Sequence, residues 1–164
     1  LPAPAQGDAP RLYCRGMLNA PELERGSEPV TRLEVAQMLL PLADDQLPAP
    51  ELTDTAEEAA RRAAANRFFP LEKGCFAPRR TISRQEMATV AMQACGVNYR
   101  NASSTMPVCT DVDRVANNYG TNAARALYFG FMQLEADGRF DPERPVSRKE
   151  AVEILDRVAD FAGL

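Results

Sequence analysis

Three arginines in one recurring pattern are the residues best suited to bind a ligand. The pattern reads aliphatic residue, hydroxyl residue, arginine, variable residue, glutamate, and it occurs in VTRLEVAQML (30–39), ISRQEMATVA (82–91) and VSRKEAVEIL (146–155). An arginine matches a carboxylate or phosphate through two parallel hydrogen bonds, and a helix start adds free backbone amides. Because the helix dipole disfavours a cation in the first turn, the repeated choice of Arg32, Arg84 and Arg148 predicts an anion-binding role. The alternative is that each arginine pairs with a nearby acid or packs its stem between repeats.

The hydroxyl residue and the glutamate of the pattern have a structural interpretation. In a capping box, the hydroxyl oxygen accepts a hydrogen bond from the third helical amide, and the glutamate accepts one from the amide of the capping residue. The three pairs are Thr31 with Glu34, Ser83 with Glu86, and Ser147 with Glu150. We therefore expect a helix to begin at each arginine, stabilised by about 1 kcal/mol per cap.

The composition argues against an enzyme. The chain of 164 residues contains no histidine, so the commonest general base and metal ligand is missing. We expect no catalytic activity, no cofactor and no metal site. A net charge of -4 does not favour nucleic acid, and no apolar run approaches the roughly 20 residues of a membrane-spanning helix. The first residues, LPAPAQGDAP, are typical of a mature terminus or a linker rather than a signal peptide.

Helices separated by Gly/Pro loops are the elements that would position the arginines. Behind each arginine, apolar residues recur at spacings typical of one helical face. They are Val35, Met38, Leu39 and Leu42; then Met87, Val90, Ala91 and Ala94; then Ala151, Ile154, Leu155 and Val158. The loops GCFAPRR and GRFDPER precede the second and third copies and share glycine, phenylalanine and proline. Further upstream, Thr53-Asp54 and Thr110-Asp111 open alanine-rich segments and predict a helix start at each place.

Each copy of the pattern thus predicts a unit of helix, loop and helix. We interpret residues 1–164 as one compact unit with repeats at about 8–44, 45–97 and 98–164. The first repeat is the most degenerate, because it has no phenylalanine before its pattern and only a short first helix.

The four cysteines, Cys14, Cys75, Cys95 and Cys109, lack the paired CxxC spacing of a structural zinc site. Their even number favours disulfides, which persist in an oxidising compartment. From their positions in the repeats we expect Cys95 to pair with Cys109 across a short connection, and Cys14 to pair with Cys75.

The segments GCFAPRRTISRQE and GRFDPERPVSRKE, with the starts LTDT and CTDV, resemble S-layer homology domains in three tandem copies. In that family a Phe-x-Asp-like start, a Gly-x-Phe-x-Pro loop and a Thr-Arg-Ala-Glu-like motif follow one another. The chain departs from it in having no tryptophan and in replacing the alanine of the motif by Leu33, Gln85 or Lys149. The resemblance implies a cell-wall anchor whose grooves between repeats bind acidic, often pyruvylated, polysaccharide, with Arg32, Arg84 and Arg148 on the anionic group.

The predicted fold is all-α, with three helix-loop-helix repeats around a pseudo-threefold axis, because packing the second helices together buries their apolar faces. The predicted function is noncatalytic attachment to the cell envelope through an acidic wall polysaccharide or modified peptidoglycan, in an extracellular or cell-surface location. Two alternatives stay open: a protein–protein interaction domain of a surface protein, and an accessory domain of a secreted hydrolase. The oligomeric state and the wall polymer are also left open.

Overall fold

The computed structural model describes residues 16–18, 26–96 and 105–163. Their elements are the α-helices α2 (Arg32–Leu39), α3 (Glu58–Ala65), α4 (Arg84–Ala94), α5 (Gly120–Tyr128) and α6 (Arg148–Ala162), and the short 3-10 helices η2 (Leu40–Leu42) and η3 (Val112–Arg114). These described ranges contain isolated β-bridges but no strand, so the predicted all-α class is confirmed for them. The first helix predicted for residues before Gly16 lies outside them.

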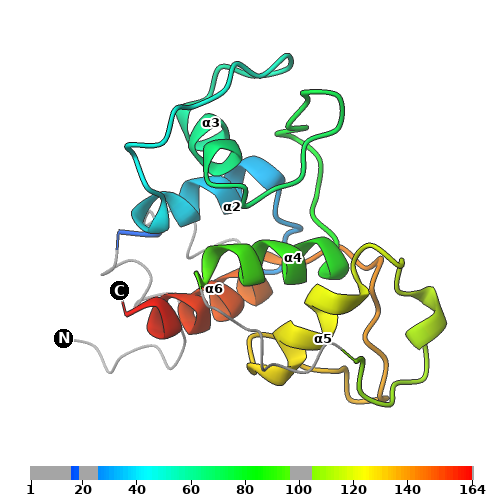
Figure 1. The fold of residues 1–164 in the computed structure, drawn as a ribbon. Coiled ribbons are helices and arrows are strands. Elements are labelled where there is room, and N and C mark those ends of the chain that lie inside the picture. The colour runs from blue at the N-terminus through cyan, green and yellow to red at the C-terminus, as the bar shows by residue number, and fades with distance from the viewer. Residues whose placement is uncertain (1–15, 19–25, 97–104, 164) are drawn as a thin grey trace.

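The three helices that begin at the arginines, α2, α4 and α6, contribute buried residues to one core cluster. Figure 1 shows α4 and α6 at the centre, with α2 and α3 on one side and α5 on the other. All the predicted core positions behind the arginines are buried except Leu42, which is half-buried. No described helix has the length and apolar composition needed to cross a membrane.

The aliphatic residues that open the pattern meet in a closed ring of hydrogen bonds. The amide of Val30 donates to the carbonyl of Val146 (2.9 Å), Val146 donates to Ile82 (2.9 Å), and Ile82 donates back to Val30 (3.2 Å). All three side chains are buried, with 0% of their surface exposed. The starts of α2, α4 and α6 are therefore held together at one point in the core.

The residues behind this ring repeat one set of backbone contacts. Leu33 donates to the carbonyl of Pro78 (3.0 Å), Gln85 to Pro142 (3.0 Å), and Lys149 to Gly26 (2.9 Å). The start of α2 is thus bonded to the loop before α4, the start of α4 to the loop before α6, and the start of α6 to the segment before α2. This register defines corresponding positions in the three loops.

The Thr-Asp pairs do not begin helices, contrary to the prediction. Helix α3 begins at Glu58 and α5 at Gly120, well after Asp54 and Asp111. Neither helix has a side-chain cap, and the 3-10 turn η3 that follows Asp111 has none either. The two aspartates have partners in the Gly/Pro loops instead.

The predicted disulfide between Cys95 and Cys109 is wrong, since both residues carry thiols. The Cys95 thiol, at the C-cap of α4, donates to the carbonyl of Met92 over 3.2 Å. Cys109 interacts with the carboxylate of Asp111, and burial raises the pKa of its thiol. Each sulfur is therefore engaged within its own segment.

The second predicted pair involves Cys14, which lies outside the described residues. Cys75 is a thiol, and its Sγ lies 3.2 Å from the hydroxyl of Thr53. The predicted oxidising compartment was inferred from disulfides. The three cysteines that the structure describes form none, so they do not support that inference.

Candidate functional site

All three hydroxyl and glutamate pairs form capping boxes. At α2, Thr31 Oγ1 accepts from the Glu34 amide (3.3 Å) and Glu34 Oε2 accepts from the Thr31 amide (2.9 Å). The boxes at α4 and α6 have the same bonds, at 3.2 to 3.4 Å. Both bonds are local, so the sequence pattern alone specifies them.

The three arginines of the pattern are buried. Arg32, Arg84 and Arg148 expose 2%, 4% and 2% of their surfaces. Although they occupy the first helical position, their guanidinium groups reach across to other segments. The structure thus places them beneath the surface, at the contacts between segments.

Two of these guanidinium groups bond to backbone carbonyls of the next loop. Arg32 donates from Nε to Phe76 O (2.7 Å) and from Nη2 to Pro70 O (2.9 Å). Arg84 donates from Nε to Phe140 O (2.6 Å) and from Nη2 to Gln133 O (2.6 Å). Corresponding donors therefore have corresponding acceptors in two consecutive segments.

Aromatic rings cover the same guanidinium groups. The Arg32 guanidinium lies 5.0 Å from the ring centroid of Phe69 and 5.2 Å from that of Phe76. The Arg84 guanidinium lies 5.1 Å from that of Phe140. Burial lowers the pKa of both arginines, yet a guanidinium keeps its proton in a protein. Each is a fixed positive charge held by carbonyl dipoles and ring faces.

Two of the three capping glutamates, Glu150 and Glu34, take a second partner from a neighbouring segment. Arg84 Nη1 lies 3.3 Å from Glu150 Oε1, and Arg148 Nη2 bonds to Glu34 Oε1. For Arg32 the corresponding glutamate is Glu86, whose charge raises the arginine pKa without a direct bond. Each glutamate thus caps its own helix and balances the arginine of another, which offsets the poor placement of a cation in a first turn.

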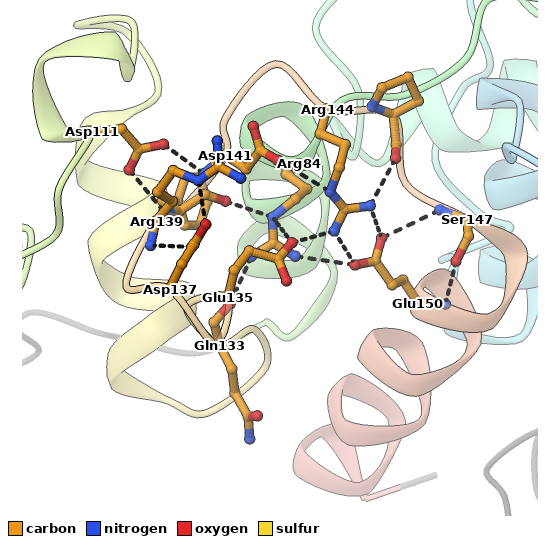
Figure 2. A network of polar contacts seen from close by, with 12 residues as sticks. Arg84, Asp111, Gln133, Glu135, Asp137, Arg139, Asp141, Arg144, Ser147 and Glu150 are labelled. Atoms are coloured by element: carbon orange, nitrogen blue, oxygen red, sulfur yellow. Dashed lines mark hydrogen bonds and ion pairs between the residues drawn. The ribbon is translucent and has the colours of Figure 1, made fainter.

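Arg144 extends this network at α6. Figure 2 shows Glu150 and Glu135 each in contact with both Arg84 and Arg144. Arg144 Nη2 lies 2.5 Å from Glu150 Oε1 and 2.5 Å from Glu135 Oε1. Burial disfavours the charged form of Glu150, but the bond and charge of Arg144 outweigh it, and the pKa of Glu150 lies below its ordinary value. The positive charge here is fully engaged by protein carboxylates.

Two aspartates not predicted as site residues hold the Gly/Pro loops. Asp54 accepts from the amides of Phe76 (2.9 Å) and Ala77 (2.7 Å), and Asp111 accepts from those of Phe140 (2.8 Å) and Asp141 (2.8 Å). The loops need such support, because Ala77 and Asp141 have φ of 55° and 58°. The Thr-Asp pairs were visible in the sequence, but their partners lie more than 20 residues away.

Two grooves lie beside these contacts. The first, of about 510 Å³, is called the α2 groove here, and its lining residues are Leu33, Asp54, Thr55, Glu57, Ala77, Pro78, Arg79 and Arg80. The second, of about 160 Å³, is lined in part by Arg84, Glu135 and Glu150. Arg32 and Arg148 line neither of the two. Among the described residues, no group of three or more Cys, Asp or Glu side chains could hold a metal ion.

The comparisons with known proteins identify one segment. The family model described as the S-layer homology domain matches residues 110–152, which include Asp111, the second Gly/Pro loop, Arg148 and Glu150. A search of the curated proteins finds no match. S-layer homology domains are generally cell-wall anchoring modules, so the match associates this segment with the cell surface. It covers one domain, not three.

Proposed function

We propose that the chain is a noncatalytic envelope anchor built from three S-layer homology repeats around a pseudo-threefold axis. It binds an acidic or pyruvylated wall polysaccharide, or modified peptidoglycan, in grooves between repeats. The observation that carries the proposal is the cyclic set of contacts among the three pattern segments. The matched segment, 110–152, contains Val146, which donates its amide to Ile82 and accepts from Val30. Ile82 and Val30 are bonded to each other by the same kind of amide–carbonyl hydrogen bond.

The three arginines have a structural part in this proposal. Their guanidinium groups fix the loops that form the groove walls, because Arg32 and Arg84 bond to the carbonyls of Phe76 and Phe140. Direct contact between an anion and Arg32, Arg84 or Arg148, as predicted from the sequence, stays a prediction. Such a contact requires a guanidinium nitrogen that has no hydrogen-bond partner within the protein. The Nη1 atoms of Arg32 and Arg148 have no such partner, but they are buried away from solvent.

Sedimentation with wall sacculi tests the proposal. The chain should sediment with untreated sacculi and remain in solution with sacculi whose polysaccharide has been removed by acid extraction. The extracted polysaccharide, added back, should compete. Binding that survives extraction would identify peptidoglycan as the ligand. No sedimentation with any sacculi of the source organism would refute the anchoring function.

A further inference from the structure

We infer that the α2 groove binds one sugar unit carrying a carboxylate or a phosphate, and that Arg79 is the residue that binds the anion. The inference rests on the proposed function and specifies its site. It assigns the anion to an exposed loop arginine instead of the buried arginines of the pattern. It also predicts one such site per chain.

The lining of the α2 groove combines an apolar and a polar surface, both of which a bound sugar requires. Leu33, Ala77 and Pro78 supply apolar contacts for the carbon-bound faces of a pyranose ring. Thr55 and Glu57 supply groups for sugar hydroxyls. The volume of about 510 Å³ lies within the range usual for small-ligand sites.

Arg79 is the available cation of this groove. Its side chain is exposed, and it forms no hydrogen bond or ion pair with any part of the chain that the structure describes. Its neighbour Arg80 is engaged, with Nη2 2.9 Å from Glu86 Oε1. The groove carboxylate of Asp54 accepts the amides of Phe76 and Ala77, one on each oxygen, and forms no ion pair with Arg79.

The corresponding positions of the other two loops lack such a cation. The backbone register pairs Pro78 with Pro142 and Gly26, so the counterparts of Arg79 are Glu143 and Ser27. Glu143 reverses the charge, and its Oε2 lies 3.1 Å from Arg114 Nη2. One loop of three therefore presents an unengaged guanidinium, which predicts a single anion site.

Titration of the full chain with small sugars, followed by NMR amide shifts, tests the groove directly. The probes are glucuronic acid for the carboxylate, glucose 6-phosphate for the phosphate, and methyl glucoside as the neutral control. At least one acidic probe should shift the amides of Thr55, Ala77 and Arg79, and the neutral probe should not. The stronger of the two acidic probes identifies the anion. Arg79→Gln should weaken its binding at least about tenfold, since a charge-assisted contact is lost.

Lys73→Gln is the matched control, because Lys73 lies in the same loop, is exposed and does not line the groove. It removes the same charge and should leave probe binding unchanged. Equal weakening by both substitutions, or shifts centred on Arg84 instead of the groove, would overturn the inference. So would wild-type amides that no acidic probe shifts.

Sacculus sedimentation of the same variants separates this inference from the proposed function. If wild type and Arg79→Gln both sediment with untreated sacculi, and to the same extent, the assignment of Arg79 is wrong and the anchoring function stands. If neither sediments but acidic probes occupy the groove and Arg79→Gln abolishes that binding, the site is correct and wall anchoring fails.

Discussion

Replacing Arg84 with alanine is expected to destabilise the fold itself. The sequence alone predicts a different outcome, in which the substitution weakens wall binding and leaves folding intact. The structure argues against that outcome, because the Arg84 side chain is only 5% exposed and joins α4 to the loop before α6. A buried connection of this kind is part of the core.

The size of the effect follows from the partners that alanine would leave behind. The carbonyls of Phe140 and Gln133 each accept from Arg84 at 2.6 Å. The Phe140 bond is buried and the Gln133 bond is part-buried, and an unsatisfied buried acceptor costs about 1–3 kcal/mol. Glu150 loses one cation but keeps Arg144, so its charge remains paired. We therefore expect the free energy of unfolding to fall by about 2–4 kcal/mol, from the carbonyls that lose their donor rather than from an unpaired carboxylate.

Urea denaturation followed by circular dichroism measures this loss. Arg84→Lys keeps the positive charge but cannot donate to both carbonyls in the same geometry. Its free energy of unfolding should therefore lie between those of the wild type and Arg84→Ala. Arg114→Ala is the surface control: its side chain is 54% exposed and forms an ion pair with Glu143, so the change should stay within about 1 kcal/mol. If the free energy of unfolding of Arg84→Ala lies less than about 1 kcal/mol below that of the wild type, the carbonyl contacts do not stabilise the fold.

Four further substitutions test three separate features of the chain by the same denaturation assay. Ser83→Ala and Ser147→Ala should each lower the free energy of unfolding by about 1 kcal/mol through loss of the cap, without changing probe binding in the α2 groove. Arg67→Gly should stabilise the protein by up to about 1 kcal/mol, because Arg67 has a φ of 58° after α3, where Gly130 stands after α5; a loss of stability would contradict this. Burial disfavours ionised Asp111, but the hydrogen bonds from the amides of Phe140 and Asp141 outweigh burial and lower the pKa of Asp111. The ionised carboxylate therefore stabilises the fold at neutral pH, and this stabilisation is lost as the pH falls below the ordinary pKa of an aspartate and through the lowered pKa. Asp111→Asn should therefore lower stability at pH 7 and flatten the acid side of the pH profile, and an unchanged profile would refute that role.

The local features of this protein were predictable from its sequence. The helix starts, their capping boxes and the apolar faces behind them depend on residues within one or two turns of each other. The recurrence of the pattern likewise predicted that three equivalent helix starts exist. These bonds form between neighbours along the chain, so their geometry does not depend on the rest of the fold.

The partners of the arginines, aspartates and cysteines were decided only by the tertiary structure. Arg32 and Arg84 bond to residues 44 and 56 positions away, and no local pattern indicates whether such a donor meets a carbonyl or a ligand. The Thr-Asp pairs looked like helix starts because a carboxylate can accept a helical amide or a loop amide equally well. Cys95 and Cys109 are close in sequence, yet their thiols have local partners. Closure of the ring through Val30, Ile82 and Val146 brings distant segments together and thereby buries the guanidinium groups and leaves Arg79 exposed.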